Sequence, residues 1–114
     1  MYKQRDILIV RFPFTDFKEF KRRPVIVVSN DDFNLKTQDL VVCGITSSLL
    51  HKEYSVLITN DDLEEGNLAK ESLIKVTLIS TISKSIVIKR IGNIKQEKFS
   101  EVIELLRKLF SLAI

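Results

Sequence analysis

The sequence predicts a mostly β fold, a small barrel or strongly bent antiparallel sheet that is closed by a C-terminal helix. Two observations predict it. Short runs of β-branched and aromatic residues recur along the chain between polar turns, and the tail then changes to a helical spacing of apolar residues. A length of 114 residues, of which 45% are hydrophobic and 29% charged, predicts a single domain over residues 1–114.

The first two strands are predicted on either side of a basic loop. Asp6 to Phe12 is an apolar run that ends at Pro13, where a proline is expected to end the strand. Pro24 to Ser29 is the second run, with the proline as its first residue and turn-forming side chains after it. The polar segment Thr15 to Arg23 connects them and is longer than a plain hairpin requires, which is typical of a functional loop.

Later runs complete a sheet of about six strands, mainly antiparallel. They lie at residues 39–47, 54–59, 72–82 and 86–91. Asn60 to Gly66 between them is predicted to be an acidic turn. Gly92 and Asn93 are expected to break the chain before the helix. The amphipathic helix is predicted from apolar residues at three- and four-residue steps, namely Phe99, Val102, Ile103, Leu106, Leu109 and Phe110.

Composition limits the classes of function. The net charge of +3 and the pI near 9.1 permit a polyanionic partner without requiring one. The single cysteine, Cys43, forms no internal disulfide and lies in an apolar run, so we expect it to be buried and without a catalytic role. No zinc spacing or ligand pattern predicts a metal or another cofactor. With no signal peptide or spanning segment in the run after Met1, we expect a cytoplasmic protein without a membrane partner.

The segment Lys21-Arg22-Arg23-Pro24 is the first candidate site, because it joins the basic loop to a strand that can hold a guanidinium in place. An arginine presents a planar fork of donors to phosphate oxygens and stays charged at any working pH. A solvated run of charges at a strand entrance is the alternative interpretation.

Thr46, Ser47 and Ser48 close the third strand and form the second candidate site, since their hydroxyls can donate to a phosphate or orient a ribose. Strand alternation places Thr46 on the same face as Gly44, which is expected to leave room beside it for a ligand. Ordinary strand-end chemistry is the alternative. His51 is the only histidine, so a pair of histidines from one chain is excluded as the acid and base.

Six segments carry a resemblance to a known family, and they are DILIV at 6–10, FPFTD at 12–16, KRRPVIVVS at 21–29, ITS at 45–47, ESLI at 71–74 and STI at 80–82. In order and spacing they resemble the MazF/PemK-like toxins, over roughly residues 5 to 110. The resemblance implies an SH3-like barrel with a C-terminal helix, a homodimer, and a toxin that cleaves single-stranded RNA, including mRNA, at specific sequences without a metal.

The same resemblance assigns roles to individual residues. Arg23 matches the catalytic arginine of the family and Thr46 its catalytic threonine. Expected products are a 2′,3′-cyclic phosphate and a 5′-hydroxyl. The expected RNA contacts are Lys18, Lys21, Arg22, Ser47 and Ser48. The implied protein partner is a cognate antitoxin whose disordered acidic tail covers the RNA site and with which the toxin binds DNA.

The chain also departs from the family pattern. Lys18 stands where some members have an acidic residue, and whether the nearby Asp16 or Glu19 acts as a base is open. Thr77, Leu78 and Ser80 stand where the family often has polar or charged residues. Two alternatives therefore remain: a non-catalytic SH3-like module that binds RNA or protein, and a gyrase-poisoning toxin of the same fold.

Overall fold

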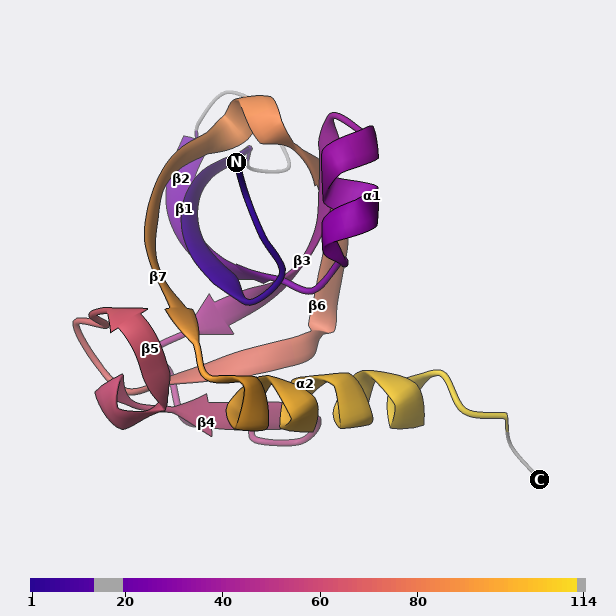
Figure 1. Cartoon of the computed structure of the whole chain (residues 1–114). Coiled ribbons are helices and arrows are strands. Elements are labelled where there is room, and N and C mark those ends of the chain that lie inside the picture. The colour runs from indigo at the N-terminus through magenta and orange to yellow at the C-terminus, as the bar shows by residue number, and fades with distance from the viewer. Residues whose placement is uncertain (14–19, 113–114) are drawn as a thin grey trace.

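The computed structural model describes residues 1–13 and 20–112, and within them seven strands form one sheet with the order β4-β6-β3-β2-β1-β7-β5. Every neighbouring pair is antiparallel, which confirms the mostly β prediction (Figure 1). The elements are β1 (Asp6–Pro13), β2 (Phe20–Val27), α1 (Asp31–Lys36), β3 (Asp39–Thr46), β4 (Ser55–Ile58), β5 (Leu63–Gly66), β6 (Ser72–Ser83), β7 (Val87–Ile94) and α2 (Gln96–Leu109).

The sheet curls into a half-barrel, so its central strands are buried on both faces (Figure 1). In β1, Leu8 and Val10 belong to one apolar cluster, while Ile7 belongs to the other. Because neighbouring residues of a strand point to opposite faces, two separate clusters need apolar residues at consecutive positions. This explains why β1 is an unbroken apolar run rather than an alternating one.

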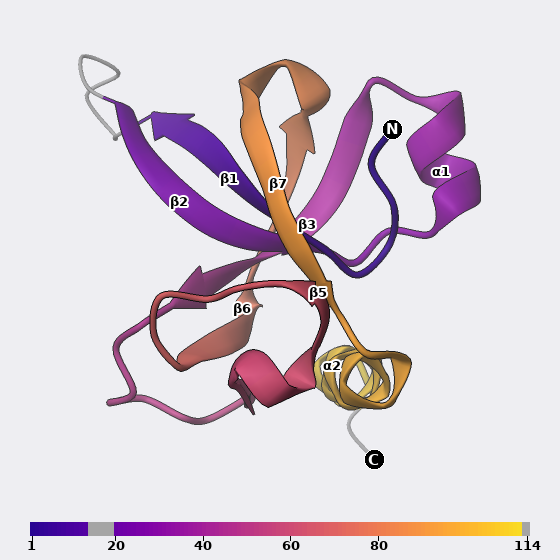
Figure 2. The ribbon, with the colours of Figure 1, turned by 60° about the vertical axis from the view of Figure 1, so that its left-hand side comes forward.

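A large bulge in β6 bends the sheet. Cys43 pairs with Ile79, yet the next residue, Gly44, pairs with Lys75 rather than with Leu78, which leaves three extra residues on β6. A bulge bends its strand and increases the local twist. The first part of β6 therefore runs in a different direction from its second part (Figure 2). The sequence pattern predicted the whole run as one strand and contained no sign of this bend.

Helix α2 lies across the β4 and β6 end of the sheet, and Phe99 and Val102 are its buried residues (Figure 1). This confirms the predicted amphipathic helix. The predicted break at Gly92 and Asn93 is wrong, because β7 continues through both residues to Ile94 and pairs there with β5. Glycine is needed for that pairing, since a Cβ at Gly92 would lie 2.3 Å from the carbonyl oxygen of Glu65.

Other predicted boundaries also need correction. The predicted turn Asn60 to Gly66 contains a 3-10 turn followed by β5, and the acidic β5 forms because β7 pairs with it. The six-residue helix α1 is too short to show an apolar period, although its cap is readable: the side chain of Asn30 accepts a hydrogen bond from the Phe33 amide. Strand β2 begins at Phe20 instead of Pro24, and Pro24 pairs with Ile9 of β1.

Candidate functional site

The candidate site lies where β2 and β3 separate. Val25 and Gly44 are the last paired residues of the two strands on this side. Continuing the same register would place Arg23 opposite Thr46, two positions further along each strand. Residues two apart on a strand share a face, so both side chains are directed to the face that Val25 and Gly44 occupy. Beyond this pairing the ribbons of β2 and β3 diverge (Figure 2), which leaves an opening between the two strands.

A cavity of about 570 Å³ occupies this opening. It brings together Lys21, Arg23 and Thr46 of the sequence-predicted site, on a wall that is otherwise largely apolar. Its described lining consists of Phe12, Lys21, Arg23, Pro24, Val25, Val42, Gly44, Ile45, Thr46, Thr77, Leu78, Ile79 and Ser80. An apolar cavity with a few convergent polar groups is the usual form of a binding site.

Arg23 lies within β2 and is paired with Val10 of β1, rather than at the end of a loop as predicted. Arg23 is an exposed residue that lines the cavity, while its backbone is part of the sheet. Pro24 sits inside the strand beyond the last β2 residue paired with β3, a position that tolerates a missing N–H group. A rigid strand therefore presents a charge that is accessible to a ligand.

Thr46 is the last residue of β3 and is half-buried. Its Oγ1 atom accepts a hydrogen bond of 3.1 Å from the backbone N–H of Ser48. A threonine hydroxyl has one hydrogen to donate besides its acceptor lone pairs. The backbone contact thus orients the hydroxyl oxygen and leaves its hydrogen for an acceptor in the cavity.

The room expected beside Gly44 is occupied by a neighbour. A Cβ atom at Gly44 would lie 3.2 Å from both Cβ and Cδ1 of Leu78, so the Leu78 side chain fills the space over the glycine. Leu78 and Thr77 belong to the bulge in β6, and Ser80, just beyond it, also lines the cavity. These three residues, which depart from the family pattern in the later strand, are therefore residues of the cavity wall.

Other predicted site residues lie elsewhere. Ser47 and Ser48 are exposed residues that follow β3 and do not line the cavity. Arg22 points to the opposite face of β2 from Arg23 by strand alternation. Lys18, with Asp16 and Glu19, lies outside the described residues.

Sequence reasoning missed Lys75, which stands opposite Gly44 and holds the loop that follows Thr46. Its ammonium group donates a hydrogen bond to the backbone carbonyl of His51. A lysine in an apolar strand pattern gives no sign of such a long-range contact. The only available signal was the interruption of the apolar run in β6.

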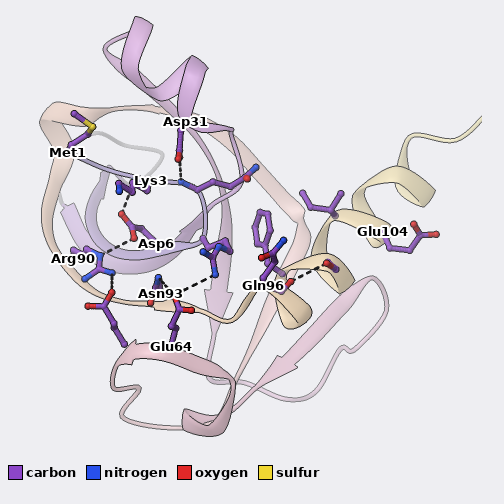
Figure 3. Close-up of a pocket in the computed structure, with 15 residues that line it drawn as sticks. Met1, Lys3, Asp6, Asp31, Glu64, Arg90, Asn93, Gln96 and Glu104 are labelled. Carbon is purple, nitrogen blue, oxygen red and sulfur yellow. Dashed lines mark hydrogen bonds and ion pairs between the residues drawn. The ribbon is translucent and has the colours of Figure 1, made fainter.

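A second, larger cavity of about 1040 Å³ lies near the N-terminus, and several of the charged side chains that line it form ion pairs with one another (Figure 3). Buried Asp6 accepts hydrogen bonds from the Lys3 amide at 2.8 Å and from Arg90 Nε at 2.9 Å, and Arg90 also contacts Glu65. The hydrogen bond that Arg90 donates to the Asp6 carboxylate is the main cause that raises the pKa of Arg90. These pairs join β1, β7 and β5, which indicates a structural junction.

Neither cavity contains a recognisable metal centre: the described residues include no group of three or more His, Cys, Asp or Glu side chains placed to hold a metal ion. Among the described helices, none has the length and apolar character needed to cross a membrane.

Cys43 is buried, as predicted, and burial raises the pKa of its thiol from the ordinary 9.0 to about 12. The unfolded chain therefore loses this proton above about pH 9, while the folded chain retains it until about pH 12. The contribution to stability is complete below pH 9 and is lost as the pH rises.

We expect the difference in unfolding free energy between the wild type and Cys43→Val to shift by about 1.4 kcal/mol in favour of the variant from about pH 8 to about pH 10. Urea titrations at the two pH values measure this shift. The same comparison between about pH 6 and about pH 8 is the control and should show no shift. A constant difference across the alkaline range would contradict the expectation.

Comparison with known proteins gives a consistent result. The model of the family described as PemK-like, MazF-like toxin of type II toxin-antitoxin system matches residues 3–110. No curated protein sequence matches the chain at a significant level.

Solved structures match the fold over nearly the whole chain. The Mycobacterium tuberculosis toxin MazF-mt6 is 19% identical with a TM-score of 0.76, covering 96% of this chain and 100% of its own. A mycobacterial endoribonuclease in complex with its cognate antitoxin is 15% identical with a TM-score of 0.81, covering 100% and 99%. A MazE-MazF structure from Deinococcus radiodurans is 16% identical with a TM-score of 0.77, covering 98% of each chain. From the match over residues 3–110, the chain belongs to the PemK-like, MazF-like toxins of type II toxin-antitoxin systems.

Proposed function

We propose that this protein is the toxin of a type II toxin-antitoxin system and cleaves single-stranded RNA at the cavity between β2 and β3. The observation that carries the proposal is the placement of Arg23 and Thr46 on one face, at matching positions beyond the last paired residues of the two strands. A fixed guanidinium and a fixed hydroxyl suit a phosphodiester, whose oxygens accept hydrogen bonds and carry negative charge. Similar solved structures include proteins named as endoribonucleases.

In the proposed reaction, the ribose 2′-oxygen attacks the adjacent phosphorus and the bond from phosphorus to the 5′-oxygen breaks. The 2′-hydroxyl loses a proton and the leaving 5′-oxygen gains one, so the products are a 2′,3′-cyclic phosphate and a 5′-hydroxyl. Arg23 stabilises the extra negative charge of the transition state through its fork of donors, and the Thr46 hydroxyl donates to a phosphate oxygen. Both groups act by position and charge, so the proposed cleavage needs no metal. The proton acceptor is left unassigned.

The apolar walls of the cavity strengthen these interactions. Phe12, Pro24 and Leu78 exclude water around the reacting phosphate, and a lower local dielectric makes each charge interaction stronger. Lys21 adds a second positive charge at the same cavity. Ser47 and Ser48 are exposed at the end of β3 and are proposed to contact RNA outside the cavity.

The proposal includes an antitoxin as partner, because three of the similar structures are named MazE-MazF and another is an endoribonuclease in complex with its cognate antitoxin. A disordered acidic segment suits Lys21 and Arg23 at the cavity between β2 and β3 and would compete with RNA there. As part of the same proposal, the toxin acts in the cytoplasm as a homodimer. Its molecular mass in solution, measured by light scattering, tests the homodimer.

The proposed function is tested by incubating the purified wild type and Thr46→Val with a long single-stranded RNA in EDTA and mapping the cleaved ends. We expect discrete cuts by the wild type with 2′,3′-cyclic phosphate and 5′-hydroxyl ends. Thr46→Val keeps the shape of the side chain and removes its donor, so its single-turnover rate should fall by about 10- to 100-fold. RNA that is bound but left intact by the wild type would contradict cleavage and favour a non-catalytic binding module.

A further inference from the structure

A third cavity, of about 480 Å³, lies on the outer face of the hairpin that β1 and β2 form. Its described lining consists of three cationic residues and one apolar residue, which are Arg11, Lys21, Arg22 and Ile88. Both arginines are exposed. We call the two arginines together with Lys21 the outer cationic surface.

The strand register sets two like charges against each other on this surface. Arg11 of β1 pairs directly with Arg22 of β2. Side chains of a directly opposite pair lie close together, and like charges in such a pair destabilise the sheet. Lys89 of β7 pairs with Ile9, two positions before Arg11, and so shares the same face. Arg11, Arg22 and Lys89 therefore gather positive charge on one face of the sheet, which attracts an anion.

Lys21 connects this surface to the cavity that holds Arg23, because it lines both. Strand β2 pairs with β3 only from Val25 to Val27, so in the described sheet β2 has β1 as its one neighbouring strand at Lys21. A linear polyanion can therefore leave the first cavity, pass over Lys21 at this edge, and reach Arg11 and Arg22 on the other face of the hairpin.

We propose that the outer cationic surface binds backbone phosphates of the RNA that flank the cleaved bond. This inference rests on the proposed function, in which the first cavity holds the reacting phosphate. Guanidinium groups bind phosphates regardless of the adjoining base, so the surface adds affinity without sequence preference and takes no part in the cleavage step.

An RNA strand suits this surface better than the acidic and apolar tail of a protein partner. Such a tail needs apolar pockets for its hydrophobic residues, and Ile88 is the one apolar residue among those described in the lining. A ligand that contacts Arg23, Lys21 and Arg11 in turn needs regularly spaced negative charges on one flexible chain, which an RNA backbone provides. Phosphate contacts of this kind make affinity strongly dependent on salt.

The experiment measures binding of RNA with a 2′-deoxy residue at the cleavage position, by fluorescence anisotropy over a range of salt concentrations. It compares strands of about 16 and about 4 nucleotides, the shorter one filling only the Arg23 cavity. For the variant Arg11→Gln with Arg22→Gln we expect the affinity for the long strand to fall by about 10-fold. The slope of log K against log salt should decrease by roughly 1.4, or 0.7 for each lost phosphate contact. The affinity for the short strand should not change.

Two variants serve as controls. Lys70→Gln with Lys108→Gln removes the same net charge at exposed positions that line neither cavity, and should retain the wild-type slope. Arg11→Lys with Arg22→Lys retains the charge and should restore most of the affinity. Circular dichroism confirms that each variant is folded.

The outcomes separate this inference from the proposed function. An equal loss of affinity for short and long strands, or an unchanged salt slope, would overturn the proposal that the outer cationic surface binds flanking phosphates, even if the wild type cleaves RNA. A wild type that binds the long strand through Arg11 and Arg22 but cleaves nothing would overturn the cleavage and retain the surface. Loss of binding to an acidic peptide, with RNA binding intact, would assign the surface to a protein partner and overturn the inference.

Discussion

Arg23→Ala is expected to reduce the single-turnover rate constant of RNA cleavage by about 10²- to 10³-fold. Arg23 lines the same cavity as Thr46, and the transition state of the proposed reaction carries one more negative charge than the bound substrate. Removing a group that acts on this charge affects the rate more than the affinity. Quenched-flow measurements at saturating RNA report the rate constant directly.

Arg23→Lys is the informative companion variant. A lysine retains the positive charge but lacks the planar fork, so only part of the lost rate should return. Lys108→Ala removes a charge from the exposed end of α2, away from the cavity lining, and should leave the rate unchanged. Cleavage by Arg23→Ala at the wild-type rate would remove Arg23 from the mechanism and would leave the family membership untouched.

Gly66→Ala is expected to lower the free energy of unfolding by about 3 kcal/mol. Gly66 has a φ of +88°, which costs a residue with a side chain about 1–2 kcal/mol. An added Cβ would also lie 2.0 Å from the carbonyl oxygen of Ile91, which is a backbone atom of the paired strand β7. Strand β5 would therefore have to move away from β7. Urea denaturation followed by circular dichroism measures the change.

Gly44→Ala is the matched control, because the three atoms nearest to its Cβ all belong to the Leu78 side chain, at 3.2 Å or more. Leu78 is 57% exposed, so its Cδ1 can turn toward solvent, and a small shift of β6 relieves the contact with its Cβ; we expect a loss of less than about 1 kcal/mol. Similar losses for the two alanine variants would show that the approach of β5 to β7 is not the reason for the glycine at position 66.

The local patterns predicted the elements that depend on local residues. The apolar run of β1 and the helical spacing of α2 were correct within a few residues, since burial sets the period of each pattern. The alternation in β3 placed Gly44 and Thr46 on one face, and both line the same cavity. The catalytic role expected for Arg23 came from the family motif at residues 21–29, and Arg23 lines the same cavity.

The missed elements depend on distant partners. Strand β5 carries little β propensity, and it forms through pairing with β7, where Gly66 and Gly92 allow the backbones to approach. Helix α1 depends on its Asn30 cap and has too few residues for a period to show. A residue pattern reports which face of an element is buried, but it does not report which strand pairs with which.

By itself, the sequence determined the mostly β class, the C-terminal helix, the buried cysteine and the residues that carry the family resemblance. The tertiary structure decided the meeting of β2 and β3 that places Arg23 and Thr46 in one cavity, the bulge that brings Leu78 over Gly44, and the pairing of Arg11 with Arg22. Apolar periodicity is a local consequence of burial, whereas register, bulges and cross-strand pairs arise when segments far apart in the chain meet, and their energies depend on both partners at once.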